Sequence, residues 1–69
     1  MKEYFKVLKT VEKNDCNIAI IAHNNGIDQE MDYIVSIYYY DSGDESDIYE
    51  STNYKKAYAY FNKYISEHN

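Results

Sequence analysis

The hydrophobic positions of this chain form segments with a two-residue period, followed by one segment with a helical period. Residues 3–12 place Phe5, Val7 and Val11 on one alternating face, which predicts a β-strand. Apolar residues of the same segment also recur at steps of three and four, so an N-terminal amphipathic helix is the alternative. The turn-forming residues 13–15 favour the strand, because they lead directly into the next apolar run.

Two further strands are predicted in the middle of the chain. Residues 17–23 are apolar on both alternating faces, as expected of a central strand. The residues Asn24, Asn25 and Gly26 tolerate positive backbone φ angles and give the clearest hairpin signal. Residues 31–40 are rich in β-branched and aromatic side chains, which is typical of a strand. One face of this strand would carry Tyr33, Val35, Ile37 and Tyr39, and the other Ile34, Ser36, Tyr38 and Tyr40.

The last third of the chain begins with a polar segment and ends with a helix. Residues 41–47 lack both periodicity and apolar content, which predicts a solvated loop, and Ile48 with Tyr49 forms either a short extra strand or the anchor of that loop. Ser51 or Thr52 is expected to cap the helix, because a hydroxyl there can accept from unpaired backbone N–H groups. The packed face of this helix would comprise Tyr54, Ala57, Tyr58, Phe61, Tyr64, Ile65 and His68.

These elements predict an α+β fold. The economical arrangement is a three-stranded antiparallel β-meander with the C-terminal α-helix packed on one face, and a short fourth strand near residues 47–50 is an option. A chain of 69 residues has room for a single domain, residues 1–69. Such a short domain needs dense packing, and ten tyrosines and two phenylalanines supply the area.

Cysteine content and hydropathy indicate a cytoplasmic protein. Cys16 is the only cysteine, so no disulfide can form within the chain. The longest apolar run covers residues 18–22 and is too short to span a bilayer, and Glu3 stands where a signal peptide would carry positive charge. We therefore expect no membrane partner.

Negative charge is concentrated in one third of the chain. Residues 28–50 contain eight carboxylates and no basic residue, whereas the segments on either side are neutral or net positive. Such a charge distribution repels phosphate backbones, so direct nucleic-acid binding is not expected. It attracts basic protein surfaces, and that attraction weakens as salt rises. A solvated segment that only keeps the domain soluble is the alternative explanation of these acids.

Catalytic and metal-binding patterns are weak. A thiolate pair of Cys16 with His23 has no supporting signature, because Cys16 falls in a predicted turn and His23 at a strand end. The acids between residues 41 and 50 do not follow the spacing of an EF-hand, in which glycine is sixth, whereas Gly43 is third here. We therefore predict a protein that is not an enzyme and uses no cofactor or metal.

Tyrosines accompany the acids, and tyrosine is enriched in binding surfaces. The acidic stretch from Asp28 to Glu50, interleaved with the run 38–40 and with Tyr49, resembles in overall character the anti-CRISPR and related anti-defence proteins of phages and mobile elements. Several of those look like compact α+β domains that block nucleic-acid-binding effectors, some by presenting carboxylates in place of DNA phosphates. Charge and tyrosine placement, and not the resemblance, select the predicted partner-binding residues, which are Asp28, Glu30, Asp32, Tyr38, Tyr40, Asp41, Asp44, Glu45, Asp47, Tyr49 and Glu50.

Three functional hypotheses follow, in order of preference. The first is a phage or mobile-element inhibitor that docks its acidic, tyrosine-rich face on the basic nucleic-acid-binding surface of a host protein or nucleoprotein complex, such as a CRISPR effector. The second is a homo-oligomeric structural or regulatory protein, for example a homodimer, that buries the uncovered face of its sheet against a copy of itself. The third and most remote is an enzyme that uses Cys16 or His23.

Overall fold

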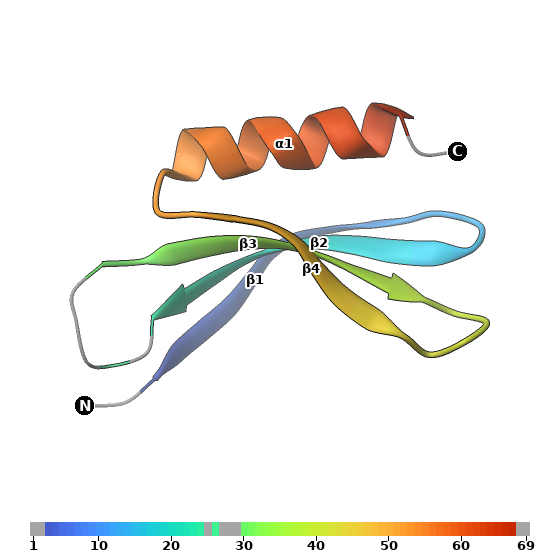
Figure 1. The fold of residues 1–69 in the computed structure, drawn as a ribbon, viewed down its shortest axis with the longest axis horizontal. Helices are drawn as coiled ribbons and strands as arrows, with labels where there is room; N and C mark the ends of the chain where they lie inside the picture. The colour runs from blue at the N-terminus through green and yellow to red at the C-terminus, as the bar shows by residue number, and fades with distance from the viewer. Residues whose placement is uncertain (1–2, 25, 27–29, 68–69) are drawn as a thin grey trace.

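The described part of the chain forms one antiparallel sheet and one helix (Figure 1). The computed structural model describes residues 3–24, 26 and 30–67. Strands β1 (Tyr4–Glu12), β2 (Cys16–Asn24), β3 (Asp32–Tyr39) and β4 (Glu45–Ser51) lie in the sheet in sequence order, and helix α1 (Tyr54–Glu67) returns across one face of it. The predicted α+β class, an antiparallel meander with a C-terminal helix, is confirmed. The helical alternative for residues 3–12 is wrong.

The sheet has four full strands, so the prediction of three strands with an optional short fourth is corrected. The strand β4 begins at Glu45, and therefore residues 45–47 are not part of a solvated loop. The loop before it is closed by two backbone hydrogen bonds, because the N–H of Tyr39 donates to the carbonyl of Asp44 at 2.8 Å and the N–H of Gly43 donates to the carbonyl of Tyr39 at 2.9 Å. Gly43 has a φ of 74°, a conformation that a residue with a Cβ rarely adopts.

The two other hairpins begin and end close to the predicted positions. In the first, the N–H of Lys13 donates to the carbonyl of Cys16 at 2.7 Å. Cys16 is the first residue of β2 and is fully buried, so its predicted place in the turn is wrong. In the second, Gly26 has the expected positive φ, at 81°, and its N–H donates to the side-chain oxygen of Asn24 at 2.7 Å. Asn25 lies outside the described residues.

Helix α1 is capped by Asn53, and not by Ser51 or Thr52 as predicted. The side-chain oxygen of Asn53 accepts from the backbone N–H of Lys56 at 3.1 Å, which satisfies one of the unpaired donors of the first turn. The hydroxyl of Ser51 instead accepts from the N–H of Asn53 at 3.0 Å and so orients the cap. His68, which the helical pattern included, lies outside the described residues.

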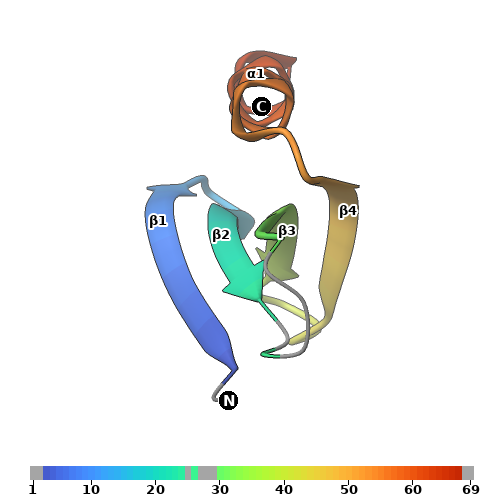
Figure 2. The same cartoon turned by 90° about the vertical axis from the view of Figure 1, so that its left-hand side faces the viewer.

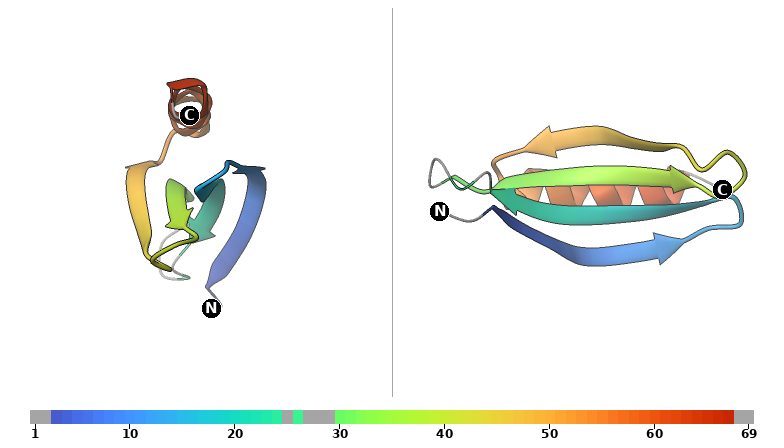
Figure 3. Two further views of the ribbon diagram at one scale, coloured as in Figure 1. Left: turned by 90° about the vertical axis from the view of Figure 1, so that its right-hand side faces the viewer. Right: turned by 90° about the horizontal axis from the view of Figure 1, so that it is seen from below.

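The hydrophobic core lies between α1 and the two central strands. Figure 2 shows the helix above the middle of the sheet, and Figure 3 shows it behind β2 and β3 when the molecule is seen from below. Ala57 and Phe61 are the buried residues of α1, and Ala57 is small enough to let the helix approach the sheet closely. They pack with the buried side chains Cys16, Ile18, Ile20, Val35 and Ile37. The predicted packed face of the helix is thus confirmed at its centre.

The cap gives a direct test of the helix start. We expect Asn53→Ala to lower the free energy of unfolding by about 1 kcal/mol, because the N–H of Lys56 loses its acceptor. The matched variant Thr52→Ala alters an exposed neighbour and should change it by less than about 0.5 kcal/mol. Urea unfolding followed by circular dichroism measures both. Equal losses for the two variants would contradict this assignment of the cap.

Candidate binding surface

The two faces of the sheet are assigned by the strand register. Directly opposite residues on neighbouring strands project from the same face. Residues Cys16, Ile18, Ile20 and Ala22 of β2 are buried on the side of α1, so the odd-numbered residues of β2 and their cross-strand partners project from the other side. We call this other side the open face, because no element of the described chain lies over it (Figure 3, right).

All the carboxylates of the four strands lie on the open face. Glu45, Asp47 and Glu50 of β4 are paired with Tyr38, Ser36 and Ile34 of β3, all of which point away from α1. Two further acids follow the same rule, since Glu12 is opposite Asn17 and Asp32 is opposite His23. The five acids of the open face are therefore Glu12, Asp32, Glu45, Asp47 and Glu50.

The lysines of the strands lie on the opposite face. Lys6 is paired with Ala22 and Lys9 with Ile20, so both project on the side of α1. The amino group of Lys9 lies 3.4 Å from the hydroxyl of Tyr58 and 5.8 Å from the centre of that ring. Lys55, Lys56 and Lys63 belong to α1 itself. Among the described strand residues, the open face carries no lysine.

An apolar row crosses the open face beside these acids. Val7, Ile21 and Ile34 are opposite one another on β1, β2 and β3, and Glu50 of β4 continues the line. Val7 is 46% exposed and Phe5, next along β1, is 61% exposed. We call Phe5, Val7, Ile21 and Ile34 the apolar row. The adjacent pair Ala19 and Ser36 is small, so the face is lower there.

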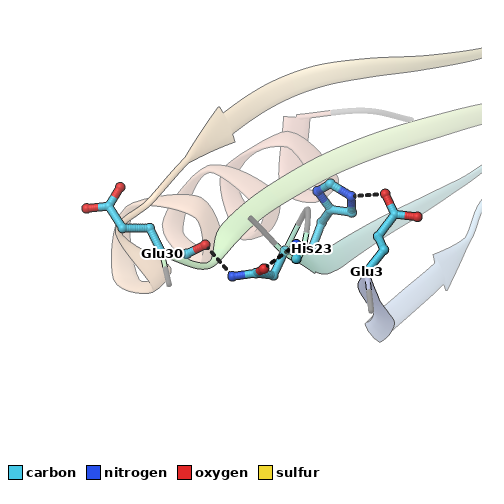
Figure 4. Close-up of polar contacts among 5 residues, drawn as sticks. Glu3, His23 and Glu30 are labelled. Atoms are coloured by element: carbon cyan, nitrogen blue, oxygen red, sulfur yellow. Dashed lines mark hydrogen bonds and ion pairs between the residues drawn. The ribbon is translucent and has the colours of Figure 1, made fainter. Parts of the chain in front are cut away.

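One corner of the open face is fixed by polar contacts (Figure 4). The Nε2 atom of His23 lies 2.8 Å from a carboxylate oxygen of Glu3, and the His23 ring meets the edge of Phe5 at 6.5 Å between ring centres. Nearby, the backbone carbonyl of Glu30 accepts from the side-chain amide of Asn24 at 2.7 Å. These contacts tie β1 and the segment before β3 to the end of β2.

Most tyrosines serve the contact between α1 and the sheet, not the open face. Tyr49 of β4 stacks on Tyr60 of α1 with 4.4 Å between ring centres, and Tyr33 of β3 meets Tyr54 at 5.2 Å. Burial, followed by the neighbouring Tyr39 hydroxyl, raises the pKa of Tyr64. Of the three tyrosines predicted for the acidic surface, only Tyr38 and Tyr40 therefore lie away from α1.

The structure brings together five of the predicted partner-binding residues on the open face: Asp32, Tyr38, Glu45, Asp47 and Glu50. Tyr40, Asp41 and Asp44 lie exposed in the loop at the end of this face, and the Tyr40 ring is 6.0 Å from that of Tyr38. Glu30 precedes β3 and is exposed, and Asp28 lies outside the described residues.

The predicted position of Tyr49 is wrong. This residue is half-buried against α1, because an extra residue at Ile48 shifts the register of β4 and turns Tyr49 toward the helix. The prediction also missed the apolar row and Glu12. The sequence shows that residues 17–23 are apolar on both faces, but only the strand register pairs Ile21 with Val7 and Ile34.

The structure separates the two residues of the proposed catalytic pair. Cys16 faces α1 at one end of β2, and His23 projects from the open face near the other end. Burial raises the pKa of the Cys16 thiol, and the hydrogen bond and charge of Asp15 raise it further, so the reactive thiolate is disfavoured. Among the described residues, no group of three or more His, Cys, Asp or Glu side chains is placed to hold a metal.

Two shallow hollows lie on the side of α1. The larger, of about 530 Å³, is beside the first turn of the helix, where β1 extends past it, and is lined by Tyr4, Leu8, Ala22, Met31, Tyr33 and Tyr54. The other, of about 340 Å³, lies along the last turns of α1. The lining of the second hollow consists of Tyr60, Lys63, Tyr64 and Glu67.

Comparisons with known proteins found no matching family model, no matching curated protein and no matching solved structure. Within residues 3–24, 26 and 30–67, no helix is long and apolar enough to cross a membrane.

The raised pKa of Cys16 predicts a loss of stability at alkaline pH. The folded protein keeps the thiol proton where the unfolded chain, with an ordinary pKa of 9.0, gives it up. The free energy of unfolding should therefore fall as the pH rises through 9. Cys16→Ala lacks this group, and its free energy of unfolding should fall less between pH 7.5 and 9.5. Parallel pH profiles in urea unfolding would contradict the prediction.

Proposed function

We propose that this protein is a non-enzymatic inhibitor of the anti-CRISPR type, encoded by a phage or mobile element, which sets its open face against the basic nucleic-acid-binding surface of a host defence complex. The observation that carries this proposal is the separation of charge between the faces, with five carboxylates on the open face and the strand lysines on the other. Opposite charges on opposite faces orient the protein as it approaches a basic partner.

The carboxylates of β4 give the proposal its geometry. Glu45, Asp47 and Glu50 follow one another along the same side of one strand, opposite the four residue steps from Tyr38 to Ile34, and at ~3.3 Å per residue they span about 13 Å. All three are exposed, so they keep their hydration until a partner binds. A basic groove that normally holds a phosphate backbone would meet this line as a substitute for that backbone.

Tyr38 and Tyr40 lie at one end of the acidic line. Tyr38 is opposite Glu45 and its ring meets that of Tyr40 edge to face. Partial burial, followed by the charge of Glu12, raises the pKa of Tyr40 above its ordinary value of 10.0, which already keeps the hydroxyl neutral at physiological pH. These two rings can contribute apolar area and hydrogen bonds next to the charges, as tyrosines do in binding surfaces.

The same charges count against the homo-oligomer hypothesis in its face-to-face form. Two open faces packed together would bring ten carboxylates into one interface, and the described strand residues offer no lysine there to pair with them. Like charges opposed across an interface cost several kcal/mol. A basic partner of another kind has no such penalty.

The proposal predicts inhibition that depends on β4. In a panel of purified CRISPR effector complexes, we expect the protein to release target DNA from at least one, measured by electrophoretic mobility shift. The triple variant Glu45→Gln, Asp47→Asn, Glu50→Gln should inhibit at least tenfold more weakly, because about 1 kcal/mol is lost for each neutralised contact. The advantage of the wild type should shrink as salt is raised.

A matched control changes the net charge equally on the other side of the molecule. The variant Asn62→Lys, Ser66→Lys, Glu67→Gln alters three exposed residues of α1 and should inhibit as well as the wild type. If the two triple variants lost equal amounts of activity, net charge and not the open face would be responsible. If no complex in the panel lost DNA, the anti-CRISPR function would be rejected.

A further inference from the structure

The apolar row is not explained by attraction between charges. Phe5 and Val7 expose more than two fifths of their surface on an edge strand, next to the half-buried Ile21 and Ile34. A surface that bound its partner through carboxylates alone would have polar side chains at these positions. Contiguous apolar side chains bordered by charge are typical of a surface that another protein covers.

We propose that the open face binds a basic amphipathic α-helix of the partner protein that runs along the strands, with part of its apolar stripe on the apolar row, which it crosses, and its Lys or Arg side chains on the carboxylates of β4. This inference rests on the binding role proposed above and names the element that is bound. An amphipathic helix has an apolar stripe between charged margins. The open face has the complementary order, with Phe5 and Val7 on β1, Ile21 and Ile34 at the centre and the acids of β4 along one margin.

The dimensions of the sheet suit a helix. The open face runs from the pair of Phe5 and His23 to the pair of Glu12 and Asn17, six residues along β2, or about 20 Å at ~3.3 Å per residue. At 1.5 Å per residue, that length corresponds to about 13 residues of helix. Helix α1 has 14 residues and already packs along the opposite face. Ser36, at the centre of this face, is only 5% exposed, so side chains around it already cover this small residue.

A second sheet fits this surface less well than a helix. A sheet stacked on the open face would extend over β4 and bury Glu45, Asp47 and Glu50 beneath it, at a large desolvation cost. A helix lying on β1, β2 and β3 leaves these three carboxylates at its margin and meets only Asp32 and Glu12, at the two ends of the face. The carboxylates of β4 remain partly hydrated at the margin while long basic side chains reach them. The charge pattern therefore favours a partner that is helical in shape and positive in charge.

The test uses two synthetic peptides of identical composition and about 18 residues. In one, leucines form a single helical stripe flanked by lysines, and in the other the leucines are distributed around the helix. We expect the striped peptide to bind at least tenfold more tightly in fluorescence anisotropy. Nuclear magnetic resonance should place its contacts on the odd-numbered residues of β2, such as Ala19 and Ile21.

A matched pair of variants separates the two faces of β1. The variant Phe5→Thr, Val7→Thr should weaken binding of the striped peptide at least tenfold, and threonine keeps a good propensity for strands. The control Tyr4→Thr changes a residue of the same strand that is 44% exposed but lies on the side of α1, and binding should stay within twofold. Equal binding of both peptides, or equal losses in both variants, would overturn the inference.

The outcomes distinguish this inference from the proposed function. Inhibition that requires β4 but is unaffected by Phe5→Thr, Val7→Thr would reject the helix and keep the inhibitor. Helix binding without inhibition of any effector would reject the inhibitor function and keep the helix-binding surface. Light scattering should show a monomer, and a dimer abolished by Phe5→Thr, Val7→Thr would overturn the inference by making a second copy the occupant.

Discussion

Phe61 and Ala57 bring α1 against the isoleucines and valine of β2 and β3, and this contact determines how the rest of the chain is used. A four-stranded sheet has two faces, and the described chain has one helix to cover them. The covered face takes the large aliphatic side chains because only there is water excluded. Everything else in the sequence has to be compatible with one face that stays in contact with solvent.

The tyrosines follow from the same contact. One helix is narrower than a sheet of four strands, so the region between α1 and β4 is neither buried nor fully exposed. Tyr49 and Tyr60 fill it as a stacked pair, and Tyr33, Tyr54 and Tyr58 continue the ring contacts at the other side. Tyrosine suits such a boundary because its ring packs while its hydroxyl remains hydrated. A small core is thereby enlarged without a second helix.

Much of the fold could be predicted from the sequence, since the period of apolar residues reports burial directly. The pattern identified β1, β2, β3 and α1, and it grouped Tyr33, Val35, Ile37 and Tyr39 correctly on one face of β3, which the helix covers. It gave β4 only as a short option near residues 47–50, for a physical reason. The strand has carboxylates on its solvent side and serines at two of its positions facing the helix, and the extra residue at Ile48 interrupts the alternation. Its composition is therefore that of a loop.

The candidate surface could be predicted only in part, because a face is a property of several strands at once. The sequence showed that acids gather between residues 28 and 50, but it could not show that β4 lies beside β3 with those acids all on one side. It also assigned Tyr49 to that surface together with Tyr38 and Tyr40, whereas Tyr49 packs against the helix. Asn53 was missed as the cap because the preceding Ser51 and Thr52 have equally suitable hydroxyls, and only the backbone path selects among the three.

The acids of β4 have two possible explanations, and the apolar row distinguishes between these explanations. Charged side chains on an edge strand discourage pairing with other sheets, and this alone would justify Glu45, Asp47 and Glu50. The other edge strand, β1, is protected in a similar way by Lys6, Lys9 and the bulge at Leu8, yet it also exposes Phe5 and Val7 on the open face. A face designed only for solubility would carry polar side chains at Val7, Ile21 and Ile34 as well. Its apolar centre and acidic margin together are the arrangement expected of a surface that is wet in the free protein and covered by a basic, amphipathic partner.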